Sequence, residues 1–429
     1  MLGLAKKVIP RSFLDALRPS YHYLLAVSGN IRYGFPARKM KIVGVTGTNG
    51  KSTTVELVNS VLKEGGFKTG MTSTVAFEIA GERRDNLTNR TTLGRWGLQK
   101  LLAEMVEKGC THAIIEVASE GIAWHRVLGI PFDVVVFTNL SPEHLNFHKT
   151  MENYRNTKGK IFKGLKNSLN KGIPKTIIVN TDDKEANYFL SFNADKKITF
   201  GLNKGEIWAT NIYFGAKTEY ELVDNSKKYL VKSELPARFN IYNMLAAYAV
   251  GKAFNIKAEK IIKGIQLVKN VKGRMEQIPN KKNKRVIIDY AVTPDAFELL
   301  FKELRRTTTG KIISVFGATG DRDKGKRPKL GEVAAKLTDY TILTEEEPYS
   351  ENSMNIIKEI ESGIKKIKNN SYEIVLDRKE AIETAIKKAG ANDTVVVTGM
   401  GHQKYRNVGG ENKVAWDEAK IIKEILDTL

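Results

Sequence analysis

Residues 41–53 read KIVGVTGTNGKST and combine three elements in a fixed order. The first six residues, Lys41 to Thr46, are short and β-branched, which predicts a buried strand, and the apolar spacing of a helix begins at Ser52. Gly47 to Gly50 predicts a turn between them. Such a turn brings backbone N–H groups and a helix N-terminus around a phosphate, with Lys51 near its outer oxygens and the Ser52 hydroxyl free for Mg²⁺.

This loop is shorter than the usual phosphate loop, because Val45 stands five residues before Gly50, where the common pattern has glycine. A chance glycine-rich turn would not also supply the strand, lysine, hydroxyl and helix that agree here. The sequence therefore predicts a nucleotide site that contains Gly47, Thr48, Asn49, Gly50, Lys51, Ser52 and Thr53.

Strands and helices alternate along the rest of the chain, which predicts an α/β fold with mainly parallel sheets. Strands are expected at 113–117, 133–138 and 176–180, and a second alternating series starts near residue 285. We place the boundary between the two series within 271–280, before a basic, turn-like stretch. The expected parts are a basic aromatic leader at 1–39, a central P-loop-type ATP-binding domain at 40–275 and a C-terminal Rossmann-like domain at 276–429.

Composition narrows the classes of function. The chain has 429 residues, 41 % of them apolar, and a formal net charge of +21, so it can bury sizeable cores and should meet anionic partners. No run approaches the roughly 18 apolar residues that cross a bilayer, and we expect a cytoplasmic protein. Cys110 is the single cysteine, which excludes an internal disulfide and a cysteine-built zinc site. No nucleic-acid-binding motif accompanies the charge, so small polyanions are the expected partners.

The leader is strongly basic. Up to residue 43 it holds eight lysine or arginine residues and one acid, Asp15, interleaved with tyrosine, leucine and phenylalanine. This mixture could lie on a membrane surface. We favour the simpler alternative, a helix that packs on the next domain.

Transfer of a γ-phosphoryl group needs cations that neutralise developing charge, so metal ligands should lie near the loop. Glu116 ends a predicted buried strand, His144 follows the next strand, and Lys158 lies in a predicted helix. Taken alone, each has an ordinary alternative, namely a surface carboxylate, a structural histidine and a surface lysine. The residue types alone do not decide between metal ligation and these alternatives.

Six further motifs follow the loop. They are EVASEG at 116–121, FTNL at 137–140 with His144, NYRNTK at 153–158, LPARFNIYN at 235–243, GRME at 273–276 and DRDKGKRP at 321–328. In this order they resemble the motifs of the Mur ligases, most closely those of the muramoyl-tripeptide synthetases among them. The resemblance covers about residues 40–429.

The resemblance implies ATP-dependent amide-bond formation in the synthesis of peptidoglycan precursors. The carboxylate of a muramoyl dipeptide would take the γ-phosphoryl group, and the amine of an amino acid would then displace phosphate. Two Mg²⁺ ions are implied, with Ser52, Glu116, His144 and a carbamylated Lys158 as ligands. The other implied contacts are Asn139, Asn240, Asn243, Arg274 and Asp289 with ATP, and Thr91, Thr92, Ser119 and Arg126 with the acceptor.

The incoming amino acid should pair its α-carboxylate with Arg322, which matches the corresponding arginine of the family. At the side-chain pocket the chain departs from the diaminopimelate-adding enzymes, because their Asp-Asn-Pro-Arg is EEPY at 346–349. The pocket has carboxylates at 345–347 and lacks the arginine, so it should favour a side-chain ammonium, and lysine or ornithine is expected. The alternative is that these glutamates only form a solvated loop. The expected contacts of the added residue are Arg322, Glu346, Glu347, Gly399 and Gln403.

Other departures leave further alternatives. Val292 stands where the family has histidine, Met400 where it has lysine and Gln403 where it has an amine-binding glutamate, which suggests a nucleotide-binding partner protein without ligase activity. About 40 residues precede the loop, fewer than a uridine-binding domain needs, so we expect an acceptor that is held without that domain or is lipid-linked. A folylpolyglutamate-synthase-like ligase is the nearest enzyme alternative. We expect a monomer.

Overall fold

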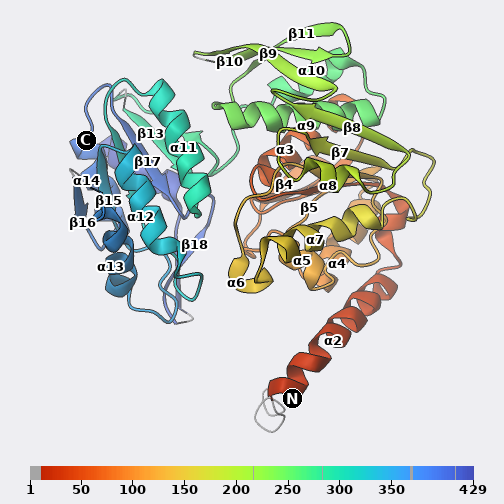
Figure 1. The fold of residues 1–429 in the computed structure, drawn as a ribbon, viewed down its shortest axis with the longest axis horizontal. Coiled ribbons are helices and arrows are strands. Elements are labelled where there is room, and N and C mark those ends of the chain that lie inside the picture. The colour runs from red at the N-terminus through yellow and green to blue at the C-terminus, as the bar shows by residue number, and fades with distance from the viewer. Residues whose placement is uncertain (1–10, 216, 283, 368–370, 411) are drawn as a thin grey trace.

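The computed structural model describes residues 11–215, 217–282, 284–367, 371–410 and 412–429, so Lys6 and Lys7 of the expected leader lie outside it. Within the described ranges, the strands form two large sheets that lie side by side, each with helices on both faces (Figure 1). A third sheet is the hairpin of β18 (Tyr405–Gly409) and β19 (Asn412–Ala415). The predicted α/β fold class with mainly parallel sheets is confirmed.

The first sheet has the strand order β11-β10-β9-β8-β7-β6-β1-β5-β2-β3-β4. In this spatial order, each neighbouring pair from β9 to β2 is parallel. Strands β10 and β11 at one end, and β3 and β4 at the other, pair antiparallel. The strands are β1 (Lys41–Thr46), β2 (Thr69–Thr72), β3 (Ala76–Ile79), β4 (Glu82–Asp85), β5 (His112–Glu116), β6 (Val134–Phe137), β7 (Thr176–Asn180), β8 (Lys196–Gly201), β9 (Ile207–Phe214), β10 (Thr218–Asp224) and β11 (Lys227–Ser233).

Both faces of this sheet are buried. Along β1, Val43 and Val45 belong to the core on one face and Ile42 to the core on the other, as the pleat of a strand requires. The first core is closed by α3 (Lys51–Glu64), α9 (Arg238–Ala253) and α10 (Ala258–Gln266), and the second by α4 (Arg95–Glu107), α7 (Met151–Lys163) and α8 (Ala186–Leu190). Burial on both faces explains why these strands are almost continuously apolar.

The second sheet has the order β12-β13-β17-β14-β15-β16. One face carries α11 (Pro294–Thr307), α12 (Lys326–Leu337) and α13 (Ser353–Ile364), and the other carries α14 (Arg378–Lys388) and α15 (Glu418–Thr428). Its strands are β12 (Glu276–Gln277), β13 (Arg285–Asp289), β14 (Ile312–Phe316), β15 (Tyr340–Leu343), β16 (Tyr372–Ile374) and β17 (Thr394–Thr398). The expected start of this series near residue 285 coincides with β13.

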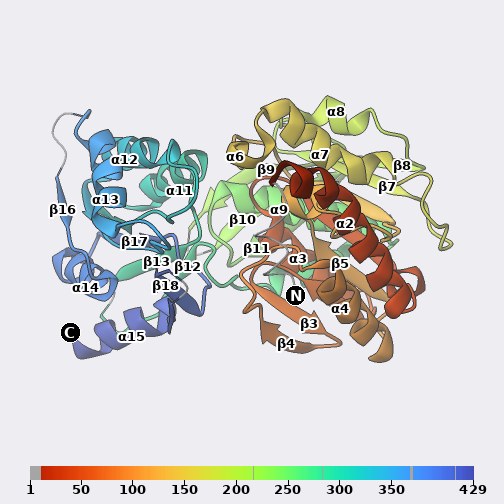
Figure 2. The ribbon, with the colours of Figure 1, turned by 90° about the horizontal axis from the view of Figure 1, so that it is seen from below.

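Helix α2 (Arg11–Arg32) precedes the first sheet and projects from it (Figures 1 and 2). Its C-terminal part packs on α4, where Trp96 Nε1 donates to Ser28 Oγ at 3.1 Å, and Asn30 Nδ2 donates to Leu128 O at 3.0 Å. This packing agrees with the favoured alternative for the leader. No helix in the described ranges combines the length and the apolar character needed to cross a membrane.

Candidate active site

The loop between β1 and α3 needs glycine at two positions. Gly47 has φ +150°, and a Cβ atom there would lie 1.9 Å from Thr138 Oγ1. Gly50 has φ +83°, and a Cβ atom there would lie 2.3 Å from Asn243 Oδ1. Glycine tolerates this left-handed backbone and leaves room for the neighbouring side chains. The loop can therefore close tightly before α3 begins at Lys51.

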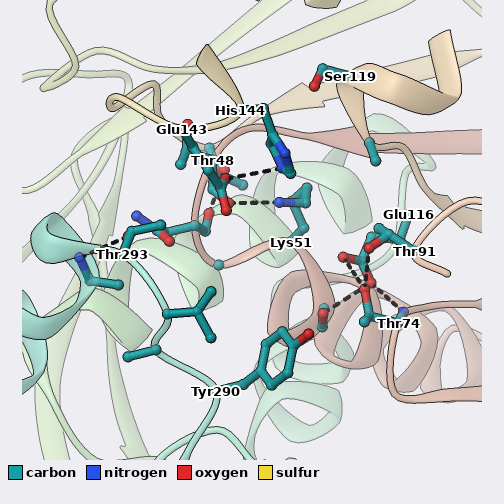
Figure 3. A pocket seen from close by; sticks show the side chains of 18 of the residues that line it. Thr48, Lys51, Thr74, Thr91, Glu116, Ser119, Glu143, His144, Tyr290 and Thr293 are labelled. Carbon is teal, nitrogen blue, oxygen red and sulfur yellow. Dashed lines mark hydrogen bonds and ion pairs between the residues drawn. The ribbon is translucent and has the colours of Figure 1, made fainter. Parts of the chain in front are cut away.

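Asn139 fixes the shape of the loop. Its Oδ1 accepts from Asn49 N at 2.9 Å, its Nδ2 donates to Asn49 O at 3.0 Å, and its backbone carbonyl accepts from Thr48 N at 2.8 Å. Lys51 Nζ donates to Thr48 O at 2.6 Å and lies across the mouth of the loop (Figure 3). The first N–H groups of an α-helix lack intrahelical partners, so the N-terminus of α3 is ready to bind phosphate oxygens.

Glu116 lies at the end of β5 beside the loop and is 1 % exposed. Its carboxylate accepts from Ser52 Oγ at 2.9 Å, from Thr74 N at 2.7 Å and from Thr74 Oγ1 at 2.9 Å (Figure 3). The hydroxyl expected to bind Mg²⁺ thus already contacts the expected carboxylate. Thr74 was not predicted, because it lies 42 residues from Glu116 in the chain and belongs to none of the motifs.

Lys158 reaches the back of the same loop from α7. Its side chain is buried, Nζ donates to Gly47 O at 2.7 Å, and Nζ lies 4.5 Å from the centre of the Tyr154 ring. Burial lowers the pKa of Lys158 well below its ordinary value, and the charge of Lys51 lowers it further. The burial of this side chain excludes the surface-lysine alternative.

His144 stands between two carboxylates at the N-terminus of α6 (Leu145–His148). Its Nδ1 lies 3.3 Å from Glu120 Oε1, and its Nε2 lies 3.7 Å from Glu143 Oε2. The hydrogen bond to His144 lowers the pKa of Glu120. Across the described ranges, no three His, Cys, Asp or Glu side chains come together as a metal cage. Ser52 and Glu116 still fit a Mg²⁺ ion whose other ligands are phosphate oxygens and water, the usual pattern for this ion.

A cavity of about 810 Å³ opens in front of the loop and is lined by residues of both sheet units. Arg274 crosses it, because its Nη2 lies 3.3 Å from Ser52 Oγ and its guanidinium lies 4.7 Å from the centre of the Tyr290 ring. Asp289 accepts from Met275 N at 2.8 Å and so fixes the backbone next to Arg274. The cavity therefore brings the nucleotide loop to the second unit.

Of the three glutamates expected in the amino-acid pocket, only Glu347 lines the cavity. Glu345 is paired with Arg406 Nη1 at 2.8 Å and also bonds to Ser353, and Glu346 accepts from Thr319 Oγ1 at 2.5 Å. Burial raises the pKa of Glu347. The expectation of three carboxylates in the pocket is corrected to one, because Glu345 and Glu346 lie outside the cavity lining and are bonded to other side chains.

The loop at 399–403 closes the same pocket. Gly399 has φ +103°, and a Cβ atom there would lie 2.2 Å from Glu346 Oε2. Burial lowers the pKa of His402 to about 3, and a hydrogen bond ties this side chain to the backbone of Thr74 on the first unit. Gln403 bonds to Glu347, whereas its Oε1 has no hydrogen-bond partner among the described residues. This wall offers a buried acceptor atom to a ligand.

One of the departures from the family pattern has a structural explanation. Met400 is fully buried in the core under the second sheet, where a lysine would have to bury its charge. Val292 lines the cavity, and its backbone carbonyl accepts from Lys326 Nζ at 2.9 Å. Any residue would supply this carbonyl, so nothing in the structure explains the valine.

The structure brings most of the predicted site residues together. Those that line the cavity are Thr48, Asn49, Gly50, Lys51, Ser52, Thr53, Thr91, Thr92, Glu116, Ser119, Arg126, Asn139, His144, Lys158, Asn243, Arg274, Asp289, Arg322, Glu347 and Gln403. Gly47 and Asn240 are not in the lining but bond to Lys158 and Asn243, and Glu346 bonds to Thr319 of the lining and lies beside Gly399. The lining also contains residues that the motifs did not single out, namely Thr74, Arg90, Glu143, Tyr290, Lys326, Tyr349 and Lys413.

A phosphate loop that faces a second α/β unit across one cavity is the arrangement of ATP-dependent ligases that form amide bonds, and the protein is an enzyme of this class. Two family descriptions match the chain, the Mur ligase middle domain over residues 45–251 and the Mur ligase glutamate ligase domain over residues 273–401. The chain belongs to the Mur ligase family, whose members act in the synthesis of peptidoglycan precursors.

Similar proteins agree with this assignment. The UDP-N-acetylmuramoyl-L-alanyl-D-glutamate–2,6-diaminopimelate ligase 1 of Clostridium acetobutylicum is 38 % identical over 94 % of this chain and 82 % of its own length. A solved structure of a ligase with that activity has a TM-score of 0.62 at 28 % identity, over 91 % of this chain and 78 % of that one. The folylpolyglutamate synthase of Mycobacterium tuberculosis has a TM-score of 0.72 at 15 % identity, over 88 % and 92 %, and shares the fold.

Proposed function

We propose that this ligase joins a diamino acid to the carboxylate of an N-acetylmuramoyl-L-alanyl-D-glutamate acceptor. The acceptor carboxylate attacks the γ-phosphorus of ATP, the bond to the β,γ-bridging oxygen breaks, and ADP leaves. The amine then attacks the acyl carbon, inorganic phosphate leaves, and the amine nitrogen loses a proton. The cavity that joins the nucleotide loop to the pocket of Arg322, Glu347 and Gln403 supports this proposal most strongly.

The residues of the first unit hold the phosphates. Lys51 and the N-terminus of α3 face the transferred group, and Asn139 keeps the loop in shape for it. When bound, Mg²⁺ would supply positive charge against the phosphate oxygens, with Ser52 and Glu116 as its protein ligands. We assign ATP binding to residues 40–275 and the incoming amino acid to residues 276–429, as the cavity lining suggests.

We propose that Lys158 is carbamylated. A neutral amine attacks CO₂, and burial beside Lys51 favours the neutral form of Lys158. The product is a carboxylate that could accompany His144 as a ligand of a second Mg²⁺. Protein exposed to ¹³C-labelled CO₂ should show one carbamate signal in its carbon NMR spectrum, which Lys158→Ala removes. Lys160→Ala, two residues along on the exposed face of α7, is the control and should keep the signal.

The incoming residue would bind with its α-carboxylate on Arg322 and its side-chain ammonium near Glu347 and Gln403 Oε1. We favour lysine or ornithine, because Tyr349 stands where an arginine would take a second carboxylate. Diaminopimelate is the second candidate, because the similar ligases named above add it and because Lys413 supplies a cation to the same cavity.

The test offers lysine, ornithine, diaminopimelate and glutamate in parallel with UDP-N-acetylmuramoyl-L-alanyl-D-glutamate and ATP. Phosphate release should require acceptor and amine together, and mass spectrometry should show the acceptor extended by lysine or ornithine. Extension by diaminopimelate alone would exclude our preferred amino acid while keeping the ligase. ATP binding without release under every combination would support the alternative of a partner protein, and extension of a folate substrate by glutamate would support the other enzyme alternative.

A further inference from the structure

Two loops of the second sheet unit carry the pocket for the incoming amino acid. The first loop, residues 319–325 between β14 and α12, presents Arg322 to the cavity. The second loop, residues 344–352 between β15 and α13, presents Glu347 and Tyr349. The Arg322 side chain is exposed, so its place in the cavity depends on the backbone of its loop. The distance between the two loops therefore determines how an amino acid fits between them.

An ion pair outside the cavity lining joins the two loops. Arg327, the second residue of α12, is fully buried, and it donates to both carboxylate oxygens of Glu351 in the second loop. The distances are 2.9 Å from Nη1 to Oε2 and 2.8 Å from Nη2 to Oε1, and such a bidentate pair fixes direction as well as distance. The same guanidinium donates to Thr319 O of the first loop at 3.4 Å and to Glu359 Oε2 of α13 at 2.9 Å. Arg327 thus contacts both loops.

The carboxylate of this pair also holds the backbone next to Arg322. Glu351 Oε1 accepts from Asp321 N at 2.7 Å, and Asp321 Oδ1 in turn accepts from Ser350 Oγ at 2.6 Å. Asp321 directly precedes Arg322 in the chain, and Ser350 directly follows Tyr349. Each of these two cavity residues therefore lies next to a residue that is bonded to the opposite loop.

The backbones of the two loops touch each other, and both are strained there. Gly320 N donates to Glu347 O at 2.7 Å, and a Cβ atom at Gly320 would lie 1.9 Å from Pro348 O. Asp321 has φ +54° and Tyr349 has φ +51°, left-handed values that a bulky residue such as tyrosine rarely adopts. Such a backbone persists only where the surrounding structure determines it. The ion pair and the hydrogen bonds around it supply that constraint.

We propose that Arg327 and Glu351 are positioning residues of the amino-acid pocket, because their ion pair sets the distance of Arg322 from Tyr349 and its neighbour Glu347. Neither of them lines the cavity, so they act through the two loops and do not touch the substrate. This inference rests on the proposed function. A changed distance between the loops would weaken binding of the amino acid and leave the nucleotide loop, on the first unit, unaffected.

The double variant Arg327→Met with Glu351→Leu separates positioning from stability. Removal of one partner alone would leave a buried charge unpaired, whereas an apolar pair of similar volume often restores stability. The apolar pair accepts no hydrogen bond from Asp321 N, so the loops lose their fixed distance. With an amino acid that wild type adds, we expect KM for that amino acid to rise about 10-fold, as for a lost charge-assisted hydrogen bond. The melting temperature, kcat and KM for ATP should stay close to those of wild type.

Arg305→Met with Asp339→Leu is the matched control. These two side chains form an ion pair at 2.6 Å in the same unit and outside the cavity lining, and their replacement should leave both KM values unchanged. Hydrogen exchange followed by mass spectrometry adds a readout that does not depend on the reaction. The amides of residues 319–325 and 344–352 should exchange faster in the Arg327 and Glu351 double variant than in wild type or in the control.

Ser350→Ala is a milder variant that tests the same connection. Ser350 is exposed, so this substitution removes one bond between the loops and buries no charge. It should raise KM for the amino acid about 3-fold at an unchanged melting temperature, and it keeps the test decisive if the double variant does not fold.

The results separate this inference from the proposed function. If wild type extends the acceptor and the folded double variant has the wild-type KM for the amino acid, the ion pair is only structural and the proposed function stands. Unchanged exchange in both loops would overturn the inference in the same way, and so would an unchanged KM in a Ser350→Ala protein when the double variant does not fold. A wild-type protein that adds no amino acid to the acceptor would overturn the proposed function and this inference with it.

Discussion

The two walls of the cavity differ in how completely their buried polar atoms are bonded. On the first wall, Glu116 accepts three hydrogen bonds and Asn139 bonds the loop through three of its polar groups. On the second wall, Gln403 lines the cavity, and its buried Oε1 has no hydrogen-bond partner among the described residues. His402 Nδ1, on the residue before it, is also buried without a partner in the described ranges but is not part of the cavity lining.

This difference indicates which wall has its hydrogen bonds formed before ligands bind. A buried polar atom that lacks a partner costs about 1–3 kcal/mol, so a polar ligand or water that bonds to Gln403 Oε1 would stabilise the second wall. The first wall is already in the geometry that phosphate transfer needs, and preorganised dipoles contribute most to such a reaction. Substitutions on the first wall should therefore affect the rate, and substitutions on the second wall should affect the affinity for the amino acid.

The largest expected effect is on the first wall. Glu116→Gln removes the negative charge of a carboxylate that accepts hydrogen bonds from Ser52 and Thr74. The substitution should lower kcat for phosphate release by about 1,000-fold and leave the melting temperature unchanged. Glu107→Gln, an exposed carboxylate near the end of α4, is the control. Loss of less than a few-fold would show that Glu116 is structural.

Gly50→Ala should be next in size. The new methyl group would lie 2.3 Å from Asn243 Oδ1 at φ +83°, so the loop must shift, and we expect ADP affinity to fall by about 100-fold. Gly66→Ala introduces the same group at φ +89° with no atom within 4 Å. This matched variant should lower the free energy of unfolding by about 1 kcal/mol. Its affinity for ADP should be unchanged, and equilibrium dialysis would measure that affinity in both variants.

Arg322→Lys should act on the second wall. Lysine keeps the charge and loses the bidentate geometry, so KM for the amino acid should rise by about 10-fold while KM for ATP stays constant. An equal rise in both constants would contradict a role confined to the amino acid. Steady-state kinetics with each substrate varied in turn would separate the two outcomes.

The smallest effect concerns acid stability. Hydrogen bonds from the fully buried Arg327 hold the pKa of Glu351 well below its ordinary value of 4.5. A carboxyl with a lowered folded-state pKa stabilises the fold above its unfolded-state pKa, and this contribution is lost as the pH falls through the folded-state value. Glu351→Gln should therefore melt at a lower temperature than wild type at pH 7, with the gap closing below about pH 4.5. A gap that is independent of pH would contradict this origin.

The sequence predicted the first wall better than the second. The loop at 47–53 is contiguous, and glycine, lysine and serine there have one geometric purpose, so local spacing is enough. The second wall depends on partners that are distant in the chain, such as Arg406, which neutralises Glu345 from 61 residues away. No local sequence pattern predicts such an ion pair.

The strength of the local sequence signal also explains why some strands were predicted and others were not. Parallel strands buried on both faces are short apolar runs, and the strands expected at 113–117, 133–138 and 176–180 coincide with β5, β6 and β7 within one residue at each end. The edge strands β4 and β11 carry charged residues on exposed positions, which weakens the apolar signal. Thr74 was missed because it lies in the connection before β3 and meets Glu116 only after the sheet forms.

The strands at the two edges of the large sheet also bear on how copies of the protein behave at high concentration. An unpaired edge offers backbone N–H and C=O groups to any passing strand, and charged side chains there oppose such pairing. β11 carries Lys227, Lys228 and Lys232, and β4 consists of Glu82, Arg83, Arg84 and Asp85. Growth of the sheet through β11 would bring its lysines together and is opposed by their like charge, whereas β4 carries equal numbers of acids and arginines.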